Sequence, residues 1–215
     1  MRLPVFFFVL PFLFLACSRS DPGISYGFIE LVYYQNDQGG RPLERYSFFI
    51  VPDHEDGVED LAELFLYHDR EGLRLKISGE DWILHEQEGK TWIGTRAIAM
   101  NENESLPRGM YRAELVSKGG GRSEKTFTFD APEESPFPFP FFTVNAGEYH
   151  IESQYPQNRL ILYDGEGSYV STLPLAGLDG SLSSLNIPGN ARTASLWAED
   201  PEYRTSAYTN AVSLR

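Results

Sequence analysis

No stretch of this chain keeps a helical period, and this feature of the sequence constrains the fold most. Short runs of aromatic and β-branched residues recur instead, separated by Gly, Pro, Asn and Asp. The clearest run is residues 73–78, where apolar side chains at 73, 75 and 77 alternate with polar ones. Such alternation is typical of a half-buried β-strand. We therefore predict an all-β chain.

Residues 24–131 are predicted to form a first β-sandwich. Residues 26–34 and 45–51 are rich in aromatic and β-branched side chains and flank a turn at 36–40, so we expect them to pair as a hairpin. Residues 58–67 fit either one helical face or a strand. We favour a strand, with a helical turn near residues 58–62.

Residues 132–140 are predicted to be a linker, because Pro136, Pro138 and Pro140 exclude a central strand. The phenylalanines between them could be ligands for an aromatic groove, but we favour packing into the junction. Residues 141–215 are predicted to form a second β-sandwich. Its expected strands are 148–151, 159–163, 169–173, 182–187, 193–198 and 207–214.

The first residues have the pattern of a secretory signal. Met1 and Arg2 give a positive start, residues 3–15 are uncharged and apolar, and Ala16 precedes Cys17. The apolar run is shorter than the roughly 20 residues that span a bilayer. We predict a signal peptide at 1–16 and a tether at 17–23.

A cysteine at the cleavage point resembles a bacterial lipoprotein signal. Phe14 and Leu15 stand where the usual motif has Leu and a small residue, and this looser pattern is similar to spirochaete lipoproteins. The resemblance implies a lipidated Cys17, removal of the preceding peptide, and anchoring to the outer membrane or to the periplasmic face of the inner membrane. The alternatives are a plain secretory signal with a chance cysteine, or an uncleaved anchor.

The segment 106–115 resembles the tyrosine corner of immunoglobulin-like and fibronectin type III sandwiches. Leu106 is followed by a turn with Pro107 and Gly109, and Tyr111 then opens an alternating strand. Ala113 stands where disulfide-bearing immunoglobulin domains have a cysteine, so the resemblance is to disulfide-free members. Residues 208–214 resemble the last strand of a fibronectin type III module. The expected architecture is two such sandwiches in tandem.

Composition excludes several function classes. The chain has 31 Asp and Glu against 18 Lys and Arg, a net charge of −13 spread along its length, which disfavours binding to nucleic acid. Its one cysteine is Cys17, so a disulfide framework and a cysteine metal site are excluded. None of the four histidines lies in a catalytic motif, and we expect neither an enzyme nor a cofactor.

Residues 53–60 are the most acidic stretch. Carboxylates at Asp53, Glu55, Asp56 and Asp60 are candidate oxygen ligands for calcium, although their spacing is not that of an EF-hand. An Asp-rich turn that caps a strand without metal is the alternative.

Four aromatic residues, Tyr33, Tyr34, Trp82 and Trp92, are candidates for a binding face if they point outward, and core residues otherwise. The combined prediction is a lipid-anchored, non-catalytic envelope protein. Its two modules would serve protein interaction or adhesion, with a membrane and another protein as partners. A carbohydrate- or calcium-binding module and a structural spacer are the alternatives.

Overall fold

The computed structural model describes residues 20–100 and 104–215, and this part of the chain consists of β-strands and short 3₁₀ helices. The all-β prediction is confirmed. Within the same residues, no helix has the length and apolarity to cross a membrane. The predicted signal peptide and Cys17 lie outside the described residues.

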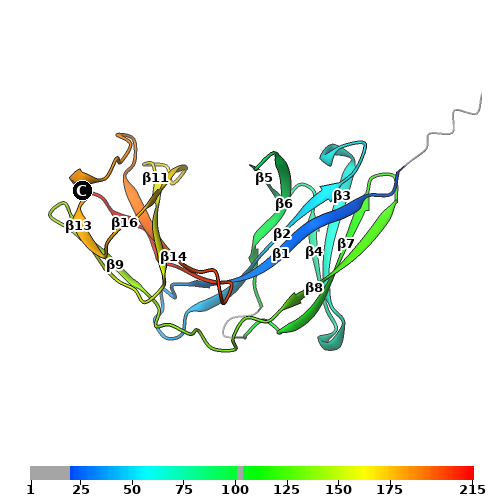
Figure 1. Ribbon diagram of the computed structural model, residues 1–215, viewed down its shortest axis with the longest axis horizontal. Helices are drawn as coiled ribbons and strands as arrows, with labels where there is room; N and C mark the ends of the chain where they lie inside the picture. Colours follow the sequence, from blue (N-terminus) through cyan, green and yellow to red (C-terminus); the bar gives the residue numbers. More distant parts are fainter. Residues whose placement is uncertain (1–19, 101–103) are drawn as a thin grey trace, which may run out of the picture.

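One large sheet runs through both halves of the molecule (Figure 1). Its strand order is β12-β11-β14-β15-β1-β2-β6-β5, and β16 pairs separately with β14. We call it the shared sheet. Its strands are β1 (Gly23–Tyr34), β2 (Leu43–Asp53), β5 (Ile83–Gln87), β6 (Lys90–Ile98), β11 (Gln157–Tyr163), β12 (Tyr169–Pro174), β14 (Thr193–Asp200), β15 (Thr205–Tyr208) and β16 (Val212–Ser213).

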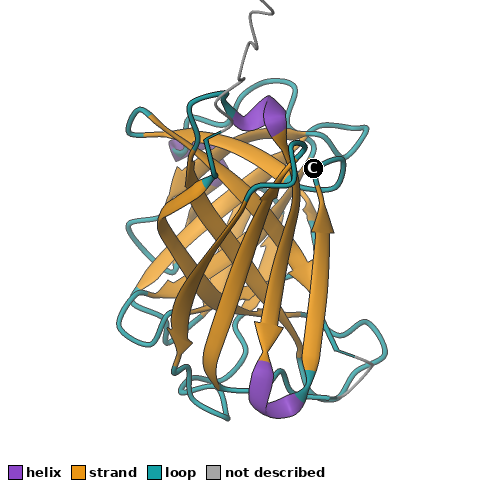
Figure 2. Ribbon diagram, turned by 90° about the vertical axis from the view of Figure 1, so that its right-hand side faces the viewer, coloured by secondary structure: helices purple, strands orange, loops and turns teal. Residues whose placement is uncertain are grey.

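Two smaller sheets accompany the two halves of the shared sheet. Figure 2 shows that strands and the loops between them make up nearly all of the described chain. The first small sheet has the order β4-β3-β7-β8 and the second the order β13-β10-β9. Their strands are β3 (Leu61–His68), β4 (Leu73–Ser78), β7 (Gly109–Ser117), β8 (Arg122–Phe129), β9 (Phe141–Asn145), β10 (Glu148–Glu152) and β13 (Asp179–Ser181).

The ambiguous segment 58–67 is a strand preceded by one helical turn, as predicted. The turn is the 3₁₀ helix Val58–Asp60, and β3 follows at once. A second 3₁₀ helix, Asp69–Glu71, joins β3 to β4.

The predicted strand at 182–187 is wrong. Its first part is a 3₁₀ helix, Leu182–Ser184, and the strand of this region is β13 just before it. The Ser184 hydroxyl donates to the Ser181 carbonyl, and the Ser181 hydroxyl accepts from the backbone N–H of Ser183. Serine side chains that bond to nearby backbone in this way compete with a strand ladder.

The two halves meet in a parallel pairing of β1 with β15, which we call the seam. Leu31 pairs with Thr205 and Tyr34 with Tyr208. β1 is long enough to pair with β2 along its whole length and to offer its other edge to β15. The sequence predicted two modules connected by the linker and did not anticipate this pairing.

The core residues of both halves belong to one hydrophobic cluster, from Ile29 in β1 to Ala207 in β15. The linker contributes to it, since Phe137 and Phe139 pack against the cluster and the Phe137 ring lies 5.1 Å from that of Tyr155. The prediction that the linker phenylalanines pack at the junction is thus confirmed.

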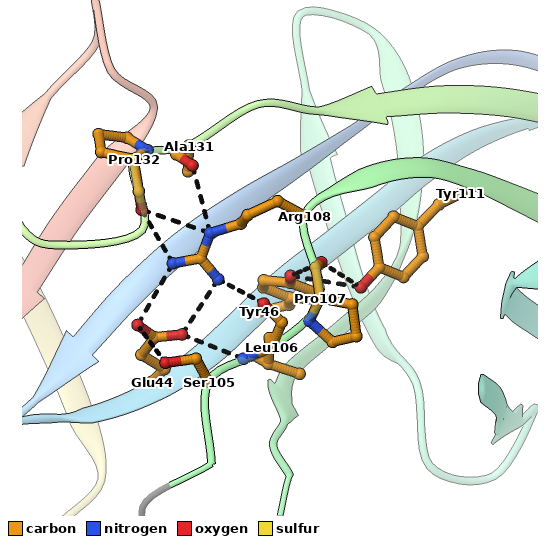
Figure 3. A network of polar contacts seen from close by, with 9 residues as sticks. All are labelled: Glu44, Tyr46, Ser105, Leu106, Pro107, Arg108, Tyr111, Ala131 and Pro132. Carbon is orange, nitrogen blue, oxygen red and sulfur yellow. Dashed lines mark hydrogen bonds and ion pairs between the residues drawn. The ribbon is translucent and has the colours of Figure 1, made fainter. Parts of the chain in front are cut away.

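A buried polar network joins β2, the loop before β7 and the start of the linker (Figure 3). The Arg108 guanidinium donates two hydrogen bonds to the Glu44 carboxylate, at 3.1 and 3.3 Å, and others to the carbonyls of Leu106, Ala131 and Pro132. The Tyr111 hydroxyl donates to the Pro107 carbonyl at 2.7 Å, which is the backward bond expected at a tyrosine corner.

Candidate functional site

The outer face of the shared sheet carries aromatic side chains on several adjacent strands. Along β1, Ile29, Leu31 and Tyr33 belong to the core cluster, so the alternate residues Phe28 and Glu30 lie on the opposite face. The outer face of a sandwich sheet is commonly polar and solvated. Here both faces of β1 carry large apolar side chains.

Two groups of aromatic rings lie on this face, one within the first half and one across the seam. In the first half, Phe28 contacts Phe49 and Trp92, with ring centroids 5.8 and 5.5 Å apart. Phe49 is only 5% exposed although it is absent from the core cluster. Because the three rings come from β1, β2 and β6, the first group crosses three adjacent strands.

The second group crosses the seam itself. Tyr208 of β15 contacts Tyr34 of β1 at 5.4 Å and Trp197 of β14 at 5.8 Å, and its hydroxyl bonds to that of Tyr163 in β11. Arg45 lies 4.6 Å above the Tyr34 ring. We call the two groups together the aromatic face: Phe28, Phe49, Trp92, Tyr34, Tyr163, Trp197 and Tyr208.

A cavity of about 130 Å³ opens on the outer face beside the seam, and we call it the seam pocket. Phe28, Phe49, Trp92 and Trp197 form its aromatic walls. Its polar lining comes from Glu30, Ser47, His85, Gln87 and Arg96. The pocket therefore exists only where both halves of the shared sheet come together.

Glu30 is the half-buried carboxyl group of the seam pocket. Burial raises the pKa of its carboxyl above the usual 4.5, and the nearby Glu199 raises it further. Arg204, Arg96 and Arg159 act in the opposite direction without cancelling the effect. Arg159 is itself paired with Glu199 at 2.8 Å. A carboxylate held here at neutral pH destabilises the fold, as functional groups often do.

Replacing Glu30 with Gln is expected to stabilise the protein at pH 7. A carboxyl with a raised pKa in the folded state binds its proton more tightly than in the unfolded chain. The free energy of unfolding of the protein therefore falls as the pH rises above 4.5 toward the folded pKa. Gln removes that loss. Urea unfolding should show a higher unfolding free energy for Glu30→Gln at pH 7 and a smaller difference at pH 4. A parent protein that is the more stable of the two at pH 7 contradicts the assignment.

The structure separates the four predicted aromatic residues. Tyr34 and Trp92 lie on the aromatic face. Tyr33 is 5% exposed and belongs to the core cluster. Neighbouring residues on a strand point to opposite faces, so Tyr33 lies on the other side of the sheet from Tyr34. Trp82 also packs against the core cluster, next to Gly79.

The sequence did not point to the other five residues of the aromatic face, which are Phe28, Phe49, Tyr163, Trp197 and Tyr208. One signal was available, since Tyr26, Phe28 and Tyr34 alternate with Ile29, Leu31 and Tyr33 along one strand. A strand that is apolar on both faces indicates that both faces are covered. No local pattern connects this strand to Trp197.

The acidic loop brings together only part of the predicted calcium set. Asp56 and Asp60 approach His54, whose Nε2 lies 3.0 Å from an Asp60 oxygen and 4.0 Å from an Asp56 oxygen. Asp53 and Glu55 are outside this group. Calcium takes six to eight oxygen ligands. Two carboxylates and an imidazole do not supply that set.

The second nitrogen of His54 also argues against a metal at this loop. A metal-bound histidine normally donates its other ring N–H to a partner. His54 Nδ1 is buried and has no hydrogen-bond partner among the described residues. The loop geometry thus fits a hydrogen-bonded turn before β3, and calcium binding stays a prediction.

A larger cavity of about 500 Å³ lies beside the polar network of Figure 3, with Tyr33, Glu44 and Ser105 in its wall. Its lining includes Met100 and Glu104. Residues 101–103, which lie between these two in the sequence, are outside the described residues.

The chain matches no protein-family model and no curated protein. Among solved structures it is similar to Tp47, the 47-kilodalton lipoprotein of Treponema pallidum, with 12% sequence identity, a TM-score of 0.46 and 88% of this chain covered. It is also similar to dimeric latent PorU from Porphyromonas gingivalis, with 14% identity, a TM-score of 0.31 and 90% coverage. The matched part is half the length of Tp47 and a fifth of PorU.

Proposed function

We propose that this chain is a lipid-anchored, non-catalytic protein of the bacterial cell envelope that binds its partner through the aromatic face. The aromatic face is the observation that carries the proposal. Trp, Tyr, Phe and Arg are the residues enriched in the cores of binding interfaces and among their energetic hot spots. Here they gather on the outer face of a sheet, where the hydrophobic core does not need them.

The anchor in this proposal is lipid on Cys17, as in the spirochaete-type signals that residues 1–17 resemble. Each buried CH₂ contributes about 0.8 kcal/mol to membrane binding, and two chains make the attachment durable. Five residues separate Cys17 from β1, a tether of at most about 18 Å at roughly 3.6 Å per residue. The first half would therefore stay close to the membrane surface.

The two halves, in this proposal, are diverged immunoglobulin-like or fibronectin type III-like sandwiches fused through the seam. The bond from Tyr111 to the Pro107 carbonyl supports this origin for the first half. The fusion gives the protein a continuous outer face that separate modules would lack.

The anchor is tested by expressing the full chain in a lipoprotein-competent bacterium and measuring the mass of its N-terminal peptide. The expected result is a diacylglyceryl or triacyl adduct on Cys17. The Cys17→Ala variant should lack this adduct and should no longer appear in the membrane fraction. An unmodified N-terminus and a soluble parent protein would contradict the anchor.

The binding face is tested in the same cells with a photo-cross-linking amino acid. Placed at position 85, on the exposed rim of the seam pocket, the cross-linking residue should form a covalent adduct with the partner. At position 74, an exposed position of β4 in the first small sheet, it should form none. Equal adducts at both positions, or none at position 85, would overturn the proposed face.

A further inference from the structure

The seam pocket has the size of one ring-shaped group. Its volume of about 130 Å³ is close to the roughly 150 Å³ of a cavity that holds one benzene ring. A protein partner of standard size would bury about 800 Å² on each side. The pocket alone is therefore a site for a single unit of a ligand.

The aromatic walls favour a ligand with flat apolar faces. Trp92 and Phe28 line the pocket from the first half, and Trp197 lines it from the second. Phe28 and Trp92 lie against each other at 51°, so their rings do not form a single plane. Rings at such angles can contact the C–H surfaces of a ring-shaped ligand from more than one side.

The polar lining provides donors and acceptors together. The Glu30 carboxylate accepts hydrogen bonds, the Arg96 guanidinium donates them, and the Gln87 amide does both. Glu30 is surrounded by Glu199 and by the guanidinium groups of Arg96, Arg159 and Arg204. Charges of both signs around one pocket give no strong preference for a cation or an anion.

We propose that the seam pocket binds one pyranose unit of a neutral glycan. Such a ring has C–H faces that pack on Trp and Phe, and hydroxyl groups that need both donors and acceptors around its edge. A purely apolar side chain would offer no hydrogen bond to the half-buried Glu30 carboxyl, which costs free energy when a ligand covers that group. The proposal rests on the proposed function, because it names the ligand class of the same face.

The test uses the full chain, purified from a lipoprotein-competent bacterium in lauryldimethylamine oxide, a detergent without a sugar headgroup. Methyl glucoside, methyl galactoside, N-acetylglucosamine and their trisaccharides are titrated, and tryptophan fluorescence and calorimetric heat are followed. At least one sugar should bind saturably with a Kd of about 0.1–10 mM, the range of weak ligands that engage a single subsite. The fluorescence change should come from Trp92 and Trp197, which line the pocket.

Matched variants separate binding from folding. Trp92→Ala and Gln87→Ala should each weaken binding, the former about tenfold or more and the latter about threefold or more. Gln87 is exposed, so its replacement does not endanger the fold. Trp82→Phe changes the one tryptophan that packs on the core cluster and should leave the affinity unchanged.

Two results overturn the glycan proposal. In one, no sugar gives a saturable signal. In the other, a sugar binds and Trp92→Ala and Gln87→Ala keep the parent affinity. If the cross-linker at position 85 then still captures a protein partner in cells, the proposed function stands with a different ligand class. If position 85 captures nothing either, both proposals fail.

Discussion

Arg108→Ala is expected to lower the free energy of unfolding by about 3–5 kcal/mol, the usual cost of breaking a buried ion pair from one side. The Arg108 and Glu44 side chains are 15% and 10% exposed. Without Arg108, the Glu44 carboxylate stays buried, and the carbonyls of Ala131 and Pro132 lose the guanidinium that holds the linker against β2. Urea unfolding of parent and variant at pH 7 measures the loss.

Two further variants check the cause of this loss. Replacing both Glu44 and Arg108 with uncharged residues should recover part of the stability, because no unpaired charge remains buried. Arg112→Ala should cost less than about 1 kcal/mol, since its partners Asp69 and Glu124 are more than half exposed. A loss for Arg108→Ala as small as that for Arg112→Ala would show that the network of Figure 3 does not hold the junction.

Gly94→Ala is expected to cost about 3 kcal/mol or more and to disturb the seam pocket as well. A Cβ atom at Gly94 would lie 2.0 Å from the Phe48 carbonyl oxygen and 2.7 Å from the Phe49 Cα. Both are backbone atoms, so β6 would have to move away from β2. Overpacking usually costs 1–3 kcal/mol, and relief here requires the ladder itself to shift. Thermal and urea unfolding measure the loss.

The matched control is Gly89→Ala in the turn between β5 and β6. Gly89 has φ 70°, and a Cβ atom there would contact nothing within 4 Å. Its cost comes only from the left-handed backbone, about 1–2 kcal/mol. If Gly94→Ala unfolds at the same urea concentration as the parent, the close approach of β6 to β2 is wrong.

Several elements were predictable because their causes are local. The hairpin of β1 with β2 follows from two runs rich in β-branched and aromatic residues around a Gly-containing turn, and the strands pair in antiparallel register as expected. β4 follows from the alternation at residues 73, 75 and 77. The serine-rich segment 182–187 was mistaken for a strand, because its side chains bond to the local backbone and no residue pattern excludes that.

The candidate site was predictable only in part. Trp92 and Tyr34 were named from residue type, but residue type alone cannot tell Tyr34 from Tyr33. A shift of one residue in register would exchange the faces of these two side chains. The side to which β1 turns its even-numbered residues is fixed by which face joins the core cluster and packs on β8, where Gly27 lies against Phe127, and that contact is not local in sequence.

The sequence by itself determined that this chain is all-β and where most strands and turns lie, because these features depend on neighbouring residues. It also determined the negative net charge, which follows from composition alone. Only the tertiary structure decided that β1 pairs with β15, which brings Leu31 beside Thr205 and Phe28 to the same pocket as Trp197. Strand pairing uses backbone groups that every residue possesses, so the choice of partner depends on the burial of whole faces. The aromatic face is a product of that choice.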